Sequence, residues 1–220
     1  MKILKIENLK KVYGKGEAEV IAVNNVSFEV EEGEFVAIIG PSGSGKSTIL
    51  HMIAGLEKPT SGKVYFYGKN MYEMNKKDLT ILRRQKIGII YQFYNLISTL
   101  NVEENITLPI ELDKKKVNRE KLDEITKFLN IDNRKKHLPN EISGGQQQKV
   151  AIGRALIINP TIILADEPTG NLDSNSSEEI IQLFKKINKE YHQTIIMITH
   201  NLEIAKQADR IIQIKDGQII

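Results

Sequence analysis

Residues 40–47 read GPSGSGKS and match the pattern Gly-x-x-x-x-Gly-Lys-Ser/Thr. An apolar run, FVAII at 35–39, precedes this segment, and a helical stretch from Ser47 to Gly55 follows it. Glycines let backbone N–H groups turn inward around a phosphate, and a helix N-terminus adds a favourable dipole. We therefore expect Lys46 to reach the β- and γ-phosphates of a nucleotide and the Ser47 hydroxyl to ligate Mg²⁺. The predicted phosphate-binding residues are Gly40, Ser42, Gly43, Ser44, Gly45, Lys46, Ser47 and Thr48.

Residues 40–47, the phosphate loop, could instead be an ordinary Gly/Ser-rich loop that matches the pattern by chance. Such a match is expected in roughly one chain in a hundred of this length, and the flanking pattern makes it rarer. The motif alone is shared by nucleoside triphosphatases, kinases and GTPases. Residues 75–78, NKKD, formally match the guanine-reading pattern of GTPases. They stand in a run typical of a helix start, so we interpret them as a solvated helix start.

Two adjacent carboxylates follow a second apolar run. Residues 161–165, TIILA, lead directly into Asp166 and Glu167. In an open parallel sheet, ligands gather at the carboxyl ends of the strands. We expect Asp166 to hold Mg²⁺ and Glu167 to orient or deprotonate an attacking water, because hydrolysis of a phosphoanhydride needs positioning and charge stabilisation. A surface Asp-Glu pair is the alternative, and the phosphate loop argues against it.

A second candidate anion site lies at residues 143–146, the SGGQ segment, which precedes a helical stretch from Gln148 to Ile157. A Gly pair is unfavourable inside a helix but suits a helix start that must approach an anion. In isolation an ordinary helix cap explains it equally well. One chain gains little from a second anion site unless that site faces a nucleotide held by another molecule.

Short apolar runs alternate with amphipathic helical stretches, which indicates an α/β fold with a mostly parallel sheet. The early runs alternate apolar and polar residues and predict an antiparallel part with one wet face. Helices are expected over Arg119–Leu129, capped by Asn118, and from a capping box at Ser176 and Glu179. Asp216-Gly217 signals a hairpin. The expected strands are Ile3–Ile6, Val20–Val30, Phe35–Ile39, Lys63–Tyr67, Ile87–Tyr91, Thr161–Ala165, Thr194–Thr199 and Arg210–Ile214.

The strand signal disappears from about Gln92 to Asn140, where helical, charged sequence takes over. We expect a single domain spanning 1–220, with an α/β core of residues 1–91 and 141–220 and an inserted α-helical subdomain of residues 92–140.

The composition excludes several classes of protein. The 220 residues hold 31 Lys and Arg against 28 Asp and Glu, and the net charge of +3 does not by itself indicate nucleic-acid binding. The absence of cysteine excludes disulfide scaffolds, iron–sulfur clusters and thiol catalysis. The longest apolar stretch, 150–165, is interrupted by Arg154, Asn159 and Pro160, so no membrane span is expected. We therefore expect a cytoplasmic protein.

The ordered set GPSGSGKS, Gln92, ISGGQQQ, IILADE, GNLDS and His200 resembles the ATP-binding subunit of ABC transporters over essentially the whole chain. The segments NEISGGQQQ and ADEPTGNLDS are similar to those of the branch of this family that serves macrolide and antimicrobial-peptide export, lipoprotein release and cell division. The resemblance implies an ATPase that binds ATP and Mg²⁺ and forms an ATP-dependent head-to-tail homodimer with two sandwiched ATP molecules.

The resemblance also implies roles for individual residues. Ser143, Gly144, Gly145 and Gln146 would contact the γ-phosphate bound by the other subunit, and Asp173 would bridge the dimer interface. Gln92 would touch Mg²⁺ or the attacking water, and His200 would hold the γ-phosphate. Tyr13 is a candidate for stacking on adenine. Without the surrounding motifs, Gln92 and His200 would read as an ordinary surface glutamine and a strand-end histidine.

The partner implied by the resemblance is a membrane permease, which would hold the subunit on the inner face of the cell membrane. Phe93, Tyr94, Leu96 and Ile97 follow Gln92 and would either receive a helix of that permease or form subdomain core. The basic segments 114–116 and 134–136 are interleaved with acidic residues and predict solvated helix faces. A soluble relative acting on nucleic acid or in translation is the alternative, but such relatives need long coiled coils, zinc-binding cysteines or a second ATPase domain. A kinase would not need the SGGQ segment.

Overall fold

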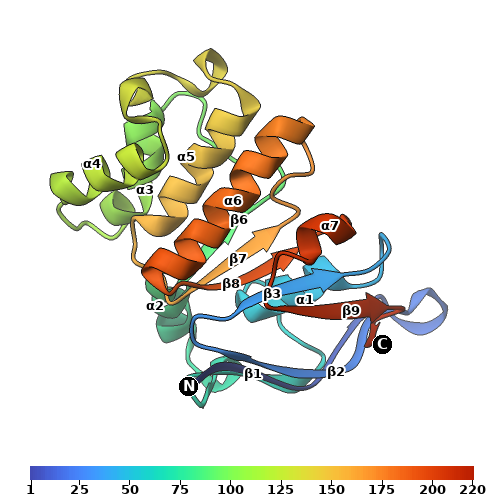
Figure 1. Cartoon of the computed structure of the whole chain (residues 1–220). Coiled ribbons are helices and arrows are strands. Elements are labelled where there is room, and N and C mark those ends of the chain that lie inside the picture. The colour runs from blue at the N-terminus through green and yellow to red at the C-terminus, as the bar shows by residue number, and fades with distance from the viewer.

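The computed structural model describes the backbone of residues 1–220 and every side chain except that of Glu17. Its centre is a six-stranded sheet with the strand order β10-β9-β3-β8-β7-β6 (Figure 1). Five of these strands are parallel, and only β10 pairs antiparallel, across the hairpin predicted at Asp216-Gly217. All five residues of β3 and of β8 are buried, as expected for strands covered on both faces. The strands are β3 (Phe35–Ile39), β6 (Ile87–Ile90), β7 (Ile162–Asp166), β8 (Thr194–Ile198), β9 (Arg210–Lys215) and β10 (Gln218–Ile219).

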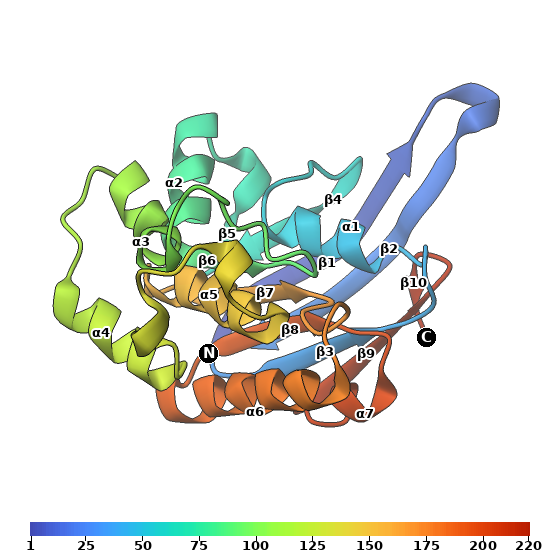
Figure 2. The ribbon, with the colours of Figure 1, turned by 90° about the horizontal axis from the view of Figure 1, so that it is seen from above.

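The second sheet is antiparallel, as the alternating pattern predicted, with the order β2-β1-β4-β5. It contains β1 (Lys2–Tyr13), β2 (Val20–Glu31), β4 (Ser61–Phe66) and β5 (Lys69–Asn70). β1 runs well beyond the predicted Ile3–Ile6 because register shifts against β2 interrupt the alternation between Ile6 and Leu9. Asn8 adopts a left-handed φ of 47° at this irregularity. The 3₁₀ turn η1 (Gly16–Ala18) lies between β1 and β2, which project together from the body in Figure 2.

Helix α1 (Lys46–Ile53) lies between the two sheets (Figure 2). Its Ile49, Leu50, Met52 and Ile53 are fully buried in an apolar cluster that also takes side chains from both sheets. A second cluster fills the other face of the parallel sheet beneath α5 (Gly144–Leu156) and α6 (Ser174–Tyr191). The parallel sheet is therefore packed on both faces, and this packing holds its strand ends in place.

Two helix starts were tested by the structure. Asn118 caps α4 (Arg119–Phe128) as predicted, by accepting a hydrogen bond from the Lys121 amide. The predicted capping box at Ser176 is wrong, because α6 begins at Ser174 and its cap is Asp173, which accepts from the amide and the hydroxyl of Ser176. An Asp one helical turn earlier is as good a cap as Ser, so the sequence alone did not separate the two.

The guanine-like NKKD segment is a solvated helix start, as interpreted. Asn75 caps α2 (Lys76–Lys86) by accepting from the Asp78 amide, and no residue of α2 is buried. After β6 the chain forms α3 (Val102–Leu112), α4, and the 3₁₀ turns η3 (Asp132–Arg134) and η4 (Pro139–Glu141). Two short elements lie elsewhere: η2 (Met71–Glu73) precedes α2, and α7 (Leu202–Ala205) follows β8. Helix α5 packs against α3, α4, β6 and α6, and so joins the helical segment to the sheet.

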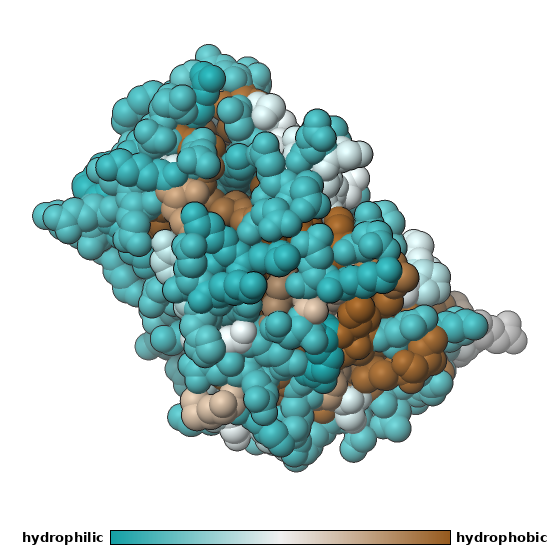
Figure 3. Space-filling model, viewed as in Figure 1, coloured by the Kyte–Doolittle hydropathy of each residue, from teal (hydrophilic) through white to brown (hydrophobic). Residues whose placement is uncertain are grey.

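The face seen in Figure 1 is mostly hydrophilic, with apolar atoms gathered around β9 and α7 (Figure 3). Ile211 and Leu202 are the exposed apolar residues of these elements. Among the described residues, no helix is long and apolar enough to cross a membrane.

Candidate functional site

A cavity of about 680 Å³ opens at the carboxyl ends of four parallel strands, β3, β6, β7 and β8. The phosphate loop follows β3, Gln92 follows β6, Glu167 follows β7 and His200 follows β8. This is the edge at which open α/β sheets bind their ligands. The cavity is lined by Ala22, Ser42, Gly43, Gly45, Lys46, Ser47, Thr48, His51, Tyr91, Gln92, Phe93, Asn95, Asp166, Glu167 and His200.

The phosphate loop is shaped to receive an anion. Lys46 is almost fully buried, and its Nζ donates to the carbonyl oxygens of Gly40 and Pro41, each at 2.8 Å. No side chain of the described residues caps the first turn of α1, so its amides stay available to a ligand. The Ser44 hydroxyl is buried without a hydrogen-bond partner among the described residues. Unpartnered donors around a buried ammonium fit a phosphate group.

Two glycines of the loop give the first prediction, because their surroundings differ. Gly45 has φ +97°, and a Cβ there would lie 2.1 Å from the Ala22 carbonyl oxygen. Gly43 has φ +77°, and a Cβ there would meet nothing within 4 Å. We expect Gly45→Ala to lower the free energy of unfolding by several kcal/mol and to abolish nucleotide binding, whereas Gly43→Ala costs only the left-handed strain of about 1–2 kcal/mol. Thermal unfolding with and without Mg-ATP measures both effects, and equal losses in the two variants would contradict this account.

The Ser47 hydroxyl lies 3.1 Å from a carboxylate oxygen of Asp166, which joins the phosphate loop to β7. Hydroxyl and carboxylate oxygens are the ligands that Mg²⁺ prefers, and Mg²⁺ usually completes its shell with phosphate oxygens and waters. Among the described residues there is no cluster of three His, Cys, Asp or Glu that would form an all-protein metal cage. The donor set therefore fits Mg²⁺ held together with a nucleotide.

Glu167 and His200 face each other at the mouth of the cavity. The Nδ1 of His200 lies 2.9 Å from Oε2 of Glu167, and the His200 amide donates to the same oxygen at 3.3 Å. Glu167 adopts a left-handed φ of 47°, a conformation that costs free energy in a non-glycine residue and is concentrated at functional sites. Two contacts to one oxygen hold the Glu167 carboxylate against His200.

Gln92 is held by Asn171, a residue that the sequence analysis did not single out. The Gln92 amide nitrogen donates to Oδ1 of Asn171, and Nδ2 of Asn171 donates to the Gln92 carbonyl, both at 3.2 Å. A Cβ on Gly170 would lie 2.8 Å from the Gln92 side chain, so the turn before Asp173 packs directly on it. The position of Asn171 inside GNLDS was the available signal.

The SGGQ segment does not line the cavity. Ser143 caps α5 by accepting from the Gln146 amide, and the Gln146 side chain accepts from the Ser143 amide in return. Close neighbours explain the glycines, because a Cβ on Gly144 would lie 2.7 Å from the Tyr94 hydroxyl and one on Gly145 would lie 3.1 Å from the Ser176 hydroxyl.

Asp173 stands at the start of α6, beside this segment, since it hydrogen-bonds the same Ser176. These bonds, the side-chain bond first, lower the pKa of Asp173 and keep its charge. Tyr13 also lies outside the cavity lining, at the end of β1, with 42% of its surface exposed. The structure therefore gathers most of the predicted residues in one cavity. The predicted residues that do not line it are Gly40, Ser44, residues 143–146, Asp173 and Tyr13.

Five lining residues were not predicted as parts of the site: Ala22, His51, Tyr91, Phe93 and Asn95. His51 follows Ser47 by one helical turn, so the helical period was a signal for it. Asn95 adopts a left-handed φ of 49° in the loop after Gln92, and nothing in its local sequence pointed to the cavity.

Comparison with known proteins places similarity along the whole chain. A family model described as ABC transporter matches residues 23–170. The chain is 46% identical over 220 residues to an uncharacterized ABC transporter ATP-binding protein of Methanocaldococcus jannaschii, covering 99% of this chain and 98% of that one. It is 47% identical over 222 residues to the macrolide export ATP-binding/permease protein MacB of Mannheimia succiniciproducens, covering 100% of this chain and 34% of that one.

Solved structures agree. The ATP-binding cassette MJ0796, in a dimeric post-hydrolysis state bound to ADP and Pi, superposes with a TM-score of 0.89 at 43% identity, covering 99% of this chain and 96% of that one. A second dimeric structure of the same cassette gives the same values.

Proposed function

Because this chain belongs to the ATP-binding proteins of the ABC transporter family, we propose that it binds and hydrolyses ATP with Mg²⁺ to power transport through a membrane permease. The observation that carries this function is a single cavity that joins the Lys46 loop, the Ser47–Asp166 pair and the Glu167–His200 pair. The loop serves phosphate binding, the Ser47–Asp166 pair serves metal binding, and the Glu167–His200 pair serves positioning of the attacking water.

The roles follow from chemistry. Lys46 and the free amides of the loop and of α1 bind the phosphates. Ser47 and Asp166 hold Mg²⁺, which supplies neutralisation of the developing phosphate charge when bound. Glu167 accepts the proton of the attacking water, and His200 orients this carboxylate and contacts the γ-phosphate. Gln92 contributes to the metal and water positions. Tyr13 stacks on adenine with a ring that is 42% exposed and has the Lys11 ammonium 4.9 Å from its centroid.

The subunit acts as an ATP-dependent homodimer. In one chain the SGGQ segment forms a capped helix start outside the cavity of that chain. Head-to-tail pairing brings this helix start and Asp173 to the nucleotide of the partner subunit. The dimeric structures of MJ0796 support the assembly of two such subunits.

A permease completes the system and holds this subunit on the inner face of the cell membrane. The relative MacB is named as an ATP-binding/permease protein. Phe93 is 68% exposed and Ile97 is 42% exposed, which suits docking, whereas Leu96 packs against the second apolar cluster. We propose residues 92–140 as the helical subdomain that carries this surface. By the same kinship, the transported molecule is a macrolide, an antimicrobial peptide or a lipoprotein-like substrate.

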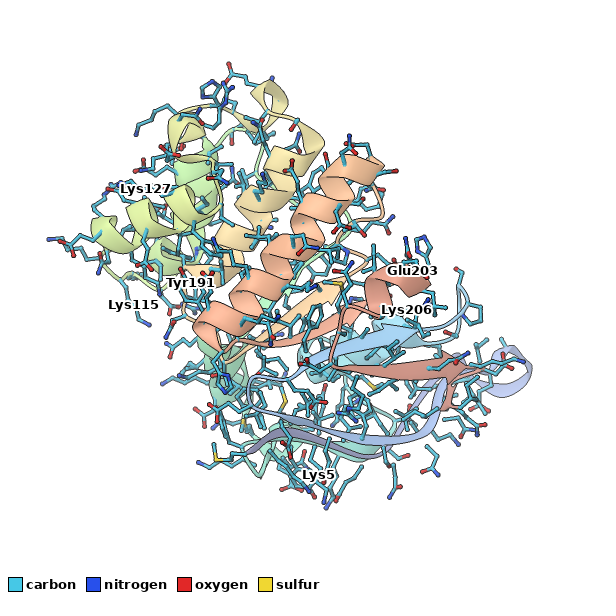
Figure 4. The ribbon with its side chains drawn as sticks, in the orientation of Figure 1. Lys5, Lys115, Lys127, Tyr191, Glu203 and Lys206 are labelled. Carbon is cyan, nitrogen blue, oxygen red and sulfur yellow. The ribbon has the colours of Figure 1, made fainter. Side chains whose placement is uncertain are left out.

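The basic segments of the helical part are not needed for docking. Lys115 pairs with Asp113, Lys135 with Asp123, and Lys136 with Glu103. Lys115 and Lys127 project from the outer edge of this part in Figure 4. Segment 114–116 is exposed, as the sequence analysis expects, whereas Arg134 Nε is buried without a hydrogen-bond partner among the described residues and the Lys135 side chain is only 22% exposed.

The proposed function is tested with the wild-type chain and Mg-ATP. We expect phosphate release to require Mg²⁺. The rate of release per mole of protein should rise with protein concentration, because two subunits complete each site. Replacing Lys46 with alanine removes the buried ammonium and is expected to abolish both binding and release. Expression in the native cell followed by purification should also recover a permease. Phosphate release without Mg²⁺ would contradict the proposal. So would a rate per mole of protein that stays the same at every protein concentration.

A further inference from the structure

Arg154 lies in the last turn of α5, the helix that begins with the SGGQ segment. Its two terminal nitrogens donate to backbone carbonyls of a different motif. Nη1 donates to the Asn95 oxygen at 2.7 Å, and Nη2 donates to the Tyr94 oxygen at 2.8 Å. The Tyr94 and Asn95 carbonyls belong to the loop of residues 91–97, which we call the Gln92 loop because it carries that residue.

The same loop contacts the other end of α5. The Tyr94 hydroxyl is the nearest neighbour of a Cβ built on Gly144, the first residue of the helix. Gly144 and Arg154 stand ten residues apart, about 15 Å along the helix axis. The long Tyr94 and Arg154 side chains span this length. The Gln92 loop therefore lies along α5, hydrogen-bonded to it at Arg154 and in contact with it at Gly144.

Arg154 is an unusual choice for a purely structural tie. Burial lowers the pKa of its guanidinium, whose two terminal nitrogens donate to carbonyls of the loop. A fork of two N–H groups with fixed geometry transmits a displacement of α5 to both carbonyls together. Tyr91, Gln92, Phe93 and Asn95 of the same loop line the nucleotide cavity.

We propose that Arg154 is a positioning residue that passes the docking of α5 on the partner's ATP to Gln92 in the subunit's own ATP site. This inference rests on the proposed dimer. Binding of the partner's nucleotide at residues 143–146 shifts α5, and Arg154 carries the Gln92 loop with it. Each site is then competent for hydrolysis only when the other is filled.

The test compares Arg154→Met, Arg154→Lys and a matched control. Lys149→Met removes another basic side chain from the same helix, one that pairs with Glu179 of α6 and does not touch the loop. For Arg154→Met we expect the ATP affinity of the monomer to stay within about twofold and kcat to fall by at least about tenfold, since a small misplacement of a positioned group has effects of this size. Arg154→Lys keeps the charge without the fork and should fall between wild type and Arg154→Met. Lys149→Met should retain the wild-type kcat.

The second readout is hydrogen exchange of residues 91–97 in the Glu167→Gln background, in which ATP holds the dimer. ATP should slow exchange in this segment when Arg154 is present, and it should fail to do so in Arg154→Met even though the dimer still forms. A normal kcat, normal protection, or loss of the dimer in Arg154→Met would overturn the proposal. If Arg154→Met does not fold, Arg154→Lys supplies the same comparison. Failure of the Arg154-containing Glu167→Gln chain to form any ATP dimer would instead refute the proposed function.

Discussion

Replacing Glu167 with glutamine is expected to slow ATP hydrolysis by about a thousandfold, the middle of the range for removal of a general base. The variant should still bind Mg-ATP and should accumulate as a dimer on size exclusion. Glutamine has the same shape, and its amide oxygen can still accept from His200 Nδ1, which lies 2.9 Å from the carboxylate in the wild type. What glutamine cannot do is take a proton from water. The dimer accumulates because its separation follows hydrolysis.

Glu203 supplies the control for this substitution. It lies on α7, near His200 in sequence, and its 78%-exposed side chain pairs with Lys206 on the surface. Glu203→Gln removes one carboxylate without touching the cavity, so the rate of phosphate release should not change. Persistent turnover in Glu167→Gln at the wild-type rate would exclude Glu167 as the base, and monomeric Glu167→Gln with bound ATP would exclude hydrolysis as the step that opens the dimer.

The second large effect is expected at Ser143. Ser143→Asp keeps the N-cap of α5 and places a carboxylate at a helix N-terminus, which maintains or raises the free energy of unfolding. The same carboxylate would face the triphosphate of the partner subunit and repel it. We expect ATP-dependent dimerisation to disappear and hydrolysis to fall by at least about a hundredfold, the loss typical of a disrupted phosphate-contacting donor. ATP binding by the monomer should remain, because Ser143 does not line the cavity of its own chain.

Ser143→Asn is the matched control, since asparagine caps a helix as well as aspartate and has nearly its shape but carries no charge. The fraction of dimer in Mg-ATP should be much higher for Ser143→Asn than for Ser143→Asp. Added salt should reduce this difference, because it screens the repulsion between the carboxylate and the phosphates. Sedimentation in Mg-ATP and nucleotide titration of the dilute monomer measure the two quantities. A loss of monomer affinity in Ser143→Asp would place this residue in its own subunit's site and contradict the cross-subunit assignment.

Local patterns were sufficient where the chemistry is written in consecutive residues. The phosphate loop, the Asp166-Glu167 pair and the capped start of α5 depend on residue types at fixed spacing, and the apolar runs before them predicted the strands that carry them. Helix α3 had no predicted bounds, because Pro109 stands inside it and the helix depends on packing against α5. The start of α6 was misplaced because Asp173 and Ser176 are both good caps.

The sequence by itself therefore determined the α/β fold class, the phosphate loop and the acidic pair, since each of these follows from short-range periodicity and spacing. Only the tertiary structure decided which of these parts meet. It brought His200, after β8, to Glu167, after the neighbouring strand β7, and it paired Gln92 with Asn171 and the Gln92 loop with Arg154. The residues in these contacts are 33 to 79 positions apart in the sequence. It also placed the SGGQ segment outside the cavity of its own chain. Long-range contacts of this kind arise from the packing of strands and helices around shared apolar clusters, and no local pattern encodes them.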